Sequence, residues 1–180
     1  KDHTHRKDLA KKHSSTYVHL VICYSYIGTG YHGLQQNLDQ KTIEKDLLEI
    51  LINSNLVDRD SVKSLNRIKW KEASRTDVGV HSAAQVLTFN SYFPLGLKLR
   101  DILPLLKANT PDDVPIYFWS VISVGNQFDA HMYAQYRQYY YLLPLSTFGN
   151  CDLDYIRDNV LPLFIGERNF HNYTRKYFSY

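Results

Sequence analysis

Residues 16–33 read TYVHLVICYSYIGTGYHG. Apolar and aromatic side chains recur at every second position of residues 16–27, and successive side chains of a strand point to opposite faces. The pattern predicts a β-strand whose buried face is formed by Val18, Leu20, Ile22, Tyr24 and Tyr26. Three glycines follow within residues 28–33, where the backbone can turn sharply. The strand is therefore expected to end in a tight loop.

The sequence after this loop alternates between helical and strand patterns. The predicted helices and strands cover about residues 42–53 (helix), 67–72 (strand), 84–89 (strand), 98–108 (helix) and 116–124 (strand). The order β-α-β-β-α-β is that of a ferredoxin-like unit, an antiparallel sheet with two helices on one face. We therefore predict an α+β fold whose first, ferredoxin-like subdomain spans residues 16–125.

Three features of the two helices can be predicted in more detail. The first helix has an apolar stripe made by Ile43, Leu47, Leu48 and Leu51. Thr42 is expected to cap this helix, because a threonine oxygen can accept a bond from a free N–H of the first turn. Pro104 lies in the middle of the second helix, where the missing N–H predicts a kink or a shorter helix.

A second cycle of elements begins after the first subdomain. Residues 132–144 are rich in tyrosine and predict a long strand, and residues 152–164 predict a helix. The sequence ends at Tyr180, before this second cycle closes. We predict that residues 126–180 form an incomplete second subdomain of similar type, and that residues 1–15 are a basic, flexible lead-in.

Charge and composition exclude several classes of protein. A hydrophobic content of 44% in 180 residues is typical of a chain with a packed core. The net charge of +3 is accounted for by residues 1–13, which carry five basic and two acidic residues. Such a tail is typical of RNA binding or nuclear import, but equally of a solvated chain end. Cys23 and Cys151 are too isolated for a disulfide framework or a zinc finger, and no apolar run reaches the length of a membrane span.

The candidate catalytic segment is SRTDVGVH, residues 74–81, between two predicted strands. An Asp77 carboxylate beside the Arg75 guanidinium stays ionised, because the opposite charge favours the charged form. An ionised carboxylate can act as a nucleophile or a base, but not as a general acid. The same pattern also fits an ordinary salt bridge in a turn, so the residues alone leave both interpretations open.

Residues 75–81, RTDVGVH, resemble the RTDxGVH signature of the TruA-type pseudouridine synthases. Four further segments resemble family motifs in the same order. Residues 26–35 resemble the first strand with its glycine turn, and residues 41–47 resemble the start of the first helix. Residues 137–144 resemble an R-x-Y-x-Y strand, and residues 166–174 resemble a G-x-x-N-F-x-N-F/Y-T segment. The resemblance spans residues 17–176, and its last two segments are most similar to the eukaryotic branch that modifies tRNA.

The resemblance implies the pseudouridine synthase fold and a role for each matched residue. Asp77 would attack the ribose, or remove a ribose proton, so that the glycosidic bond of uridine breaks and the base rejoins through C5. Arg75 would pair with Asp77 and help displace the target nucleotide, and Tyr139 would stack on the uracil. This isomerisation needs no cofactor and no metal. Family members continue beyond the position matching Tyr180, so the resemblance also implies that part of the pocket lies outside these residues.

Three further residues complete the candidate substrate-binding set. Arg137 is expected either to bind RNA or to edge the sheet. Thr76 and His81 flank Asp77 in the same loop. His81 also suggests a metal or acid–base role with Asp77, but no second ligand lies at a useful spacing. The family resemblance implies a structural role for His81 instead.

The functional prediction is an isomerase (intramolecular transferase) that converts uridine to pseudouridine in tRNA or another structured RNA. Its expected partners are RNA alone, with no membrane and no small-molecule cofactor, and it is expected to act as a monomer or homodimer. The expected location is intracellular, with the nucleus favoured over the mitochondrion and the cytoplasm. The alternatives are a non-catalytic RNA-binding module, since ferredoxin-like units also serve that role, and a metal-dependent hydrolase using Asp77 and His81.

Overall fold

The computed structural model describes residues 16–37, 39–93 and 96–173. The predicted lead-in, residues 1–15, lies outside the described residues. The chain divides into two units, residues 1–137 and 138–180. None of the helices in the described ranges has the length and apolar character needed to cross a membrane.

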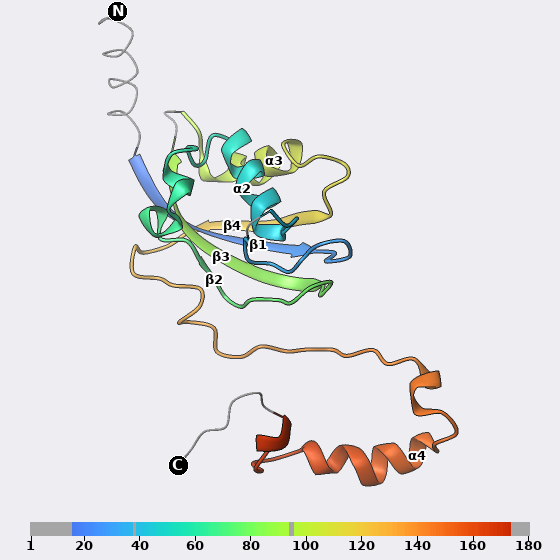
Figure 1. Ribbon diagram of the computed structural model, residues 1–180. Helices are drawn as coiled ribbons and strands as arrows, with labels where there is room; N and C mark the ends of the chain where they lie inside the picture. Colours follow the sequence, from blue (N-terminus) through green and yellow to red (C-terminus); the bar gives the residue numbers. More distant parts are fainter. Residues whose placement is uncertain (1–15, 38, 94–95, 174–180) are drawn as a thin grey trace, which may run out of the picture. The chain divides into compact units, whose positions relative to one another are not determined.

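The first unit is a four-stranded sheet with two helices on one face (Figure 1). Its elements are β1 (Thr16–Tyr26), α2 (Ile43–Asn53), β2 (Lys71–Glu72), β3 (Ser82–Phe93), α3 (Leu99–Ala108) and β4 (Ile116–Ser123). The strand order is β2-β3-β1-β4, and every neighbouring pair is antiparallel. The predicted β-α-β-β-α-β order and the ferredoxin-like fold are confirmed.

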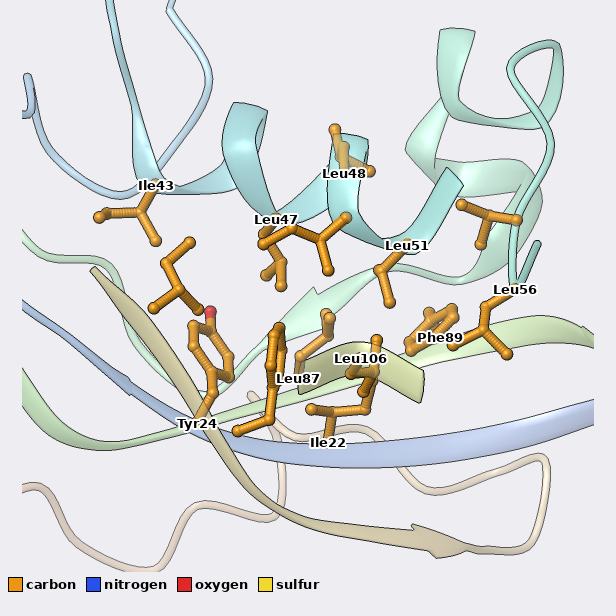
Figure 2. Packing of buried hydrophobic residues seen from close by; sticks show 14 of the residues in the cluster. Ile22, Tyr24, Ile43, Leu47, Leu48, Leu51, Leu56, Leu87, Phe89 and Leu106 are labelled. Carbon is orange, nitrogen blue, oxygen red and sulfur yellow. The ribbon is translucent and has the colours of Figure 1, made fainter. Parts of the chain in front are cut away.

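The core lies between the sheet and the two helices (Figure 2). The predicted apolar face of β1 is buried there: Leu20, Ile22 and Tyr24 are each 0% exposed. The whole predicted stripe of α2 is also buried, and β3 and α3 add Leu87, Phe89, Ile102 and Leu106. Burial of each of these large side chains stabilises the fold by about 1.5–3 kcal/mol before the entropic cost of ordering it. Strand alternation and helical periodicity were therefore sufficient to identify most of the core.

The lengths of β2 and β3 differ from the prediction. The predicted strand at residues 67–72 is reduced to Lys71–Glu72, because 3-10 helices at Ser61–Lys63 and Leu65–Ile68 precede it. In contrast, β3 is longer than the predicted residues 84–89, since it pairs with β1 from Tyr26↔Ser82 to Thr16↔Phe93. Pairing with a long neighbour extends β3 at both ends, over residues 82–83 and 90–93.

The prediction for Thr42 is partly confirmed, and the shortening of the second helix predicted from Pro104 is not observed. Thr42 occupies the N-cap position of α2, but its side chain makes no capping bond, and its buried hydroxyl lacks a hydrogen-bond partner among the described residues. Pro104 lies inside α3 without ending it. Its side chain is exposed, so the ring projects away from the core.

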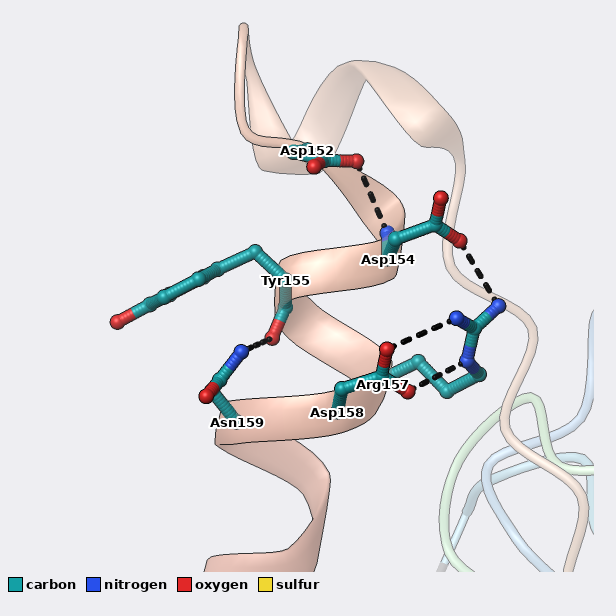
Figure 3. Close-up of polar contacts among 6 residues, drawn as sticks. All are labelled: Asp152, Asp154, Tyr155, Arg157, Asp158 and Asn159. Carbon is teal, nitrogen blue, oxygen red and sulfur yellow. Dashed lines mark hydrogen bonds and ion pairs between the residues drawn. The ribbon is translucent and has the colours of Figure 1, made fainter.

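The second unit begins with residues 138–144, which form neither helix nor strand, and its longest helical run begins at Leu153. It contains a 3-10 helix at Leu145–Phe148, α4 (Leu153–Tyr155), a π-helix at Ile156–Val160, and 3-10 helices at Leu161–Phe164 and His171–Tyr173. The predicted helix at residues 152–164 is confirmed as one helical run of mixed type. Asp152 caps it by accepting a bond from Asp154 N at 3.0 Å, and Arg157 pairs with Asp154 and Asp158 (Figure 3).

The predicted tyrosine-rich strand at residues 132–144 is wrong. Residues 134–144 have neither helical nor strand structure, and Tyr139, Tyr140 and Tyr141 are exposed. A strand forms only where a neighbour accepts its backbone hydrogen bonds, and no strand among the described residues pairs with this segment. The second ferredoxin-like subdomain therefore stays a prediction.

Candidate active-site loop

The Asp77 loop, residues 73–81, joins β2 to β3 and lies against the glycine turn, residues 28–33, that follows β1. Two backbone bonds connect the loop to the turn and to the residue that follows the turn: Gly79 N donates to Tyr31 O at 3.2 Å, and Leu34 N donates to Thr76 O at 3.0 Å. The glycine turn is itself attached to α2, because the Tyr31 hydroxyl donates to Asp46 Oδ2 at 2.7 Å. The segment quoted first in the sequence therefore supports the segment that carries the candidate catalytic residue.

Two glycines make this close approach possible. A Cβ atom at Gly28 would lie 2.1 Å from the carbonyl oxygen of Val80, which is far inside van der Waals contact. A Cβ atom at Gly33 would lie 3.0 Å from Thr76 O, and Gly33 also has a φ of +91°. Only a residue without a side chain fits between these backbones.

Asp77 lies at the start of a tight turn and faces solvent. Val80 N donates to Asp77 O at 3.2 Å, and Gly79 within this turn has a φ of +76°. Asp77, Arg75 and Val78 are all exposed. Within the described part of the chain, no ion pair joins Arg75 to Asp77. Both charged groups are therefore open to a ligand.

Replacing Gly79 by Ala is expected to lower the free energy of unfolding by about 1–2 kcal/mol, because an L-residue is strained at positive φ. No atom lies within 4 Å of the added Cβ, so backbone strain is the whole cost. Urea denaturation measures it. Gly125→Ala is the matched control, since its Cβ also meets no atom and no positive φ is involved. Equal unfolding free energies for the two variants would contradict the expectation.

Three of the other candidate residues hold the loop in place. The Thr76 hydroxyl is 2.7 Å from the Tyr26 hydroxyl, which ties the loop to the end of β1. His81 Nδ1 accepts a bond from Gly28 N at 3.1 Å, so the proton of a neutral imidazole lies on Nε2. Arg137 donates from Nε to Ala73 O at 3.0 Å, and its Nη2 reaches the same oxygen.

Two points remain: the place of Tyr139 and the metal role considered for His81. Tyr139 belongs to the second unit, where its side chain is 70% exposed. His81 uses Nδ1 for its backbone contact, which favours the structural role. Among the described residues, no three His, Cys, Asp or Glu side chains gather in a way that could hold a metal ion.

The sequence interpretation missed a buried acid pair beneath the loop, Glu44 and Glu72. Glu44 is only 4% exposed, and its Oε2 accepts a bond from Gln36 N at 2.6 Å. Glu72 retains some exposed surface, but its carboxyl group is enclosed and accepts a bond at 3.0 Å from the fully buried Tyr24 hydroxyl. The available signal was Tyr24 itself, because a buried tyrosine needs a partner for its hydroxyl.

The acid pair has unusual protonation. Burial raises the pKa of the Glu72 carboxyl to about 8, and the negative charge of Glu44 adds to this rise, whereas Tyr24 and Arg75 act in the opposite direction. Burial also raises the pKa of Glu44, against the effects of Gln36 N–H, the Trp70 indole and Arg75. The Trp70 N–H lies close enough to affect Glu44 without the geometry of a hydrogen bond.

Known proteins that are similar in sequence to the chain come from eukaryotes and from an archaeon. The chain is 28% identical over 172 residues to the human pseudouridylate synthase 1 homolog. It is 33% identical over 141 residues to tRNA pseudouridine synthase 1 of Schizosaccharomyces pombe, and 33% identical over 153 residues to tRNA pseudouridine synthase A of Methanobrevibacter smithii. No protein-family model matches the chain.

The chain belongs to the TruA-type family of pseudouridine synthases. The matches cover 86%, 73% and 84% of the chain, but only 38%, 25% and 46% of the human, yeast and archaeal proteins. The chain thus spans less than half of the length of each of these TruA-type relatives. The first unit, with the Asp77 loop, supplies the ferredoxin-like part of the TruA-type fold.

Proposed function

We propose that the protein is an RNA pseudouridine synthase, an isomerase that converts uridine to pseudouridine in tRNA. The observation that carries this proposal is the exposed Asp77 carboxylate on a loop held by the glycine turn, within the sequence RTDVGVH. The names of the yeast and archaeal relatives, both tRNA pseudouridine synthases, support tRNA as the substrate class.

The proposed reaction uses the ionised Asp77 carboxylate as nucleophile or base at the ribose. The N1–C1′ bond breaks, the detached uracil turns, and a C5–C1′ bond forms. The proton lost from C5 is balanced by the proton gained at N1, so the reaction is a redox-neutral isomerisation. A uridine inside a stem must first be flipped out, at a cost of a few kcal/mol.

The other candidate residues have supporting roles in this proposal. Arg75 contacts RNA phosphate beside the displaced nucleotide, and Tyr139 stacks on the uracil, which stabilises the flipped base by about 1–3 kcal/mol. Thr76, His81 and Arg137 fix the loop through the contacts described above. The same proposal places the protein in the nucleus, as a monomer or homodimer, and allows other structured RNAs as substrates.

Release of tritium from tRNA labelled at C5 of uridine tests the function directly. The protein is expected to release tritium in proportion to the pseudouridine formed, because C5 loses its hydrogen in the reaction. Binding of the tRNA without any tritium release would instead indicate the non-catalytic RNA-binding module. Trapping of the protein by RNA containing 5-fluorouridine provides an independent readout, since fluorine blocks the loss of the C5 substituent.

A further inference from the structure

Exposure alternates along residues 74–77 of the Asp77 loop. Ser74 and Thr76 are half-buried, whereas Arg75 and Asp77 are exposed. Such an alternation is typical of a segment whose successive side chains point to opposite sides. The two hydroxyl side chains therefore face the protein, and the two charged side chains face the solvent.

Both half-buried residues of this segment are held by side chains of the sheet. Gln85 of β3 donates from Nε2 to Ser74 O at 2.9 Å, and the same nitrogen lies 3.4 Å from Ser74 Oγ. The hydroxyl of Tyr26, at the end of β1, is 2.7 Å from Thr76 Oγ1. Asp77 therefore follows directly on a segment that is anchored at both of its inward positions.

Gln85 occupies a core position of β3, where strand alternation would place an apolar side chain. It is 1% exposed, and the next two residues on the same face, Leu87 and Phe89, are fully buried. A buried amide destabilises a core unless its polar atoms find partners.

The Gln85 amide finds these partners in its own strand and in the loop. Its Oε1 accepts a bond from Val86 N at 3.1 Å, and its Nε2 donates to Ser74 O. Because a carbonyl oxygen can only accept, the amide nitrogen must lie on the Ser74 side. Outside β3, Ser74 is the one residue that this amide bonds in the described part of the chain.

We propose that Gln85 is a positioning residue for the reaction: its amide holds Ser74 and, together with the contact between Tyr26 and Thr76, fixes the direction in which Asp77 projects. The proposal rests on the proposed function, because it assigns the chemical step to Asp77. A segment held at one point can turn about that point, whereas two anchors two residues apart define its direction. Gln85 acts through the loop backbone and does not contact the substrate.

Replacing Gln85 by Met tests this role, because Met is unbranched, of similar length and suited to an apolar core. The rate of tritium release in a single turnover is expected to fall about tenfold, since even a small displacement of Asp77 weakens its alignment with the ribose. The dissociation constant of tRNA should stay within about twofold, because the phosphate and base contacts that provide affinity are left intact. The urea midpoint should not fall, since Ser74 is half-buried and its carbonyl can bond water instead.

Ser91→Ala is the matched control. Ser91 is a fully buried polar residue on the same face of β3, and its hydroxyl donates to Leu56 O at 2.9 Å. It lies about 20 Å along the strand from Gln85, at the end remote from the Asp77 loop. Ser91→Ala is expected to lower the urea midpoint and to leave the single-turnover rate unchanged. An unchanged rate in Gln85→Met, or an equal loss of rate in both variants, overturns the proposal.

Tyr26→Phe removes the second anchor of the same segment. It is expected to lower the single-turnover rate as Gln85→Met does, because either loss lets the segment turn. The variant that carries both substitutions should then lose much less than the product of the two single losses, since both act on one direction. A loss equal to that product would mean that the two residues act independently, which contradicts joint positioning of Asp77.

Amide hydrogen exchange on the free protein provides a readout that needs no RNA. In Gln85→Met, the amides of Gly79 and Val80 should exchange faster, because their bonds to Tyr31 O and Asp77 O depend on the placement of the loop. The amides of β1 should keep their protection. If the unmodified protein releases no tritium but the loop amides of Gln85→Met exchange faster, the proposed function fails and the anchoring role of Gln85 stands. A loss of rate without any change in loop exchange shows that Gln85 does not act through position, and refutes the inference.

Discussion

Replacing Asp77 by Asn is expected to lower tritium release from C5-labelled tRNA by a factor on the order of 10⁴, as for the loss of one member of a catalytic set. The amide keeps the size of the side chain, but it is neither a nucleophile nor a base at neutral pH. Because Asp77 is exposed, its loss should change the free energy of unfolding by no more than about 0.5 kcal/mol. The tRNA dissociation constant should also stay within a few-fold.

Asp112→Asn is the control for this substitution. Asp112 is an exposed aspartate in the loop after α3, far from Asp77 in the sequence. Its replacement by Asn therefore removes the same charge from a different loop. It is expected to leave both activity and stability unchanged. Turnover by Asp77→Asn within tenfold of the unmodified protein would remove Asp77 from the reaction, while loss of activity in both variants would point to a general effect of charge.

Replacing Gly28 by Ala is expected to reduce both stability and activity, although Gly28 carries no functional group. The new Cβ would lie 2.1 Å from Val80 O and 2.7 Å from Val80 C, and both of these neighbours are backbone atoms, so the two loops must move apart. Forcing extra atoms into a packed contact costs about 1–3 kcal/mol. A displacement of Asp77 by about 1 Å is expected to lower the rate of the chemical step about a hundredfold.

Gly125→Ala is again the matched control, because its added Cβ meets nothing within 4 Å. Single-turnover tritium release and urea denaturation should be measured on both variants. Normal stability and activity of Gly28→Ala would mean that the contact between the glycine turn and the Asp77 loop does not position the active site.

The sequence predicted those features that depend on residues close to one another along the chain. Alternation over β1 and the apolar stripe of α2 determine which faces are buried, and each such pattern is complete within about a dozen residues. The order of these elements was enough to predict the ferredoxin-like unit. The RTDVGVH segment similarly identified the candidate catalytic loop, because its resemblance to a family motif is local.

The incorrect and missing predictions involve contacts between distant parts of the chain. The tyrosine-rich segment, residues 132–144, has strand composition but lacks a neighbouring strand among the described residues, so its backbone has no partner. β3 extends beyond its predicted ends because it pairs with β1 from Tyr26↔Ser82 to Thr16↔Phe93. The acid pair was missed because Glu44 and Glu72 meet only when α2 packs on the sheet.

Asp77 and its loop were therefore determined by the sequence itself, as were the elements that flank them. Only the tertiary structure decided which residues hold that loop in place and which buried acidic groups lie near it. Gly28 contacts Val80, and Glu72 shares its environment with Glu44 and Tyr24, across separations that no local pattern records. The physical reason is that steric fit and pKa depend on distances in space and on burial, and both exist only once the helices and the sheet have packed.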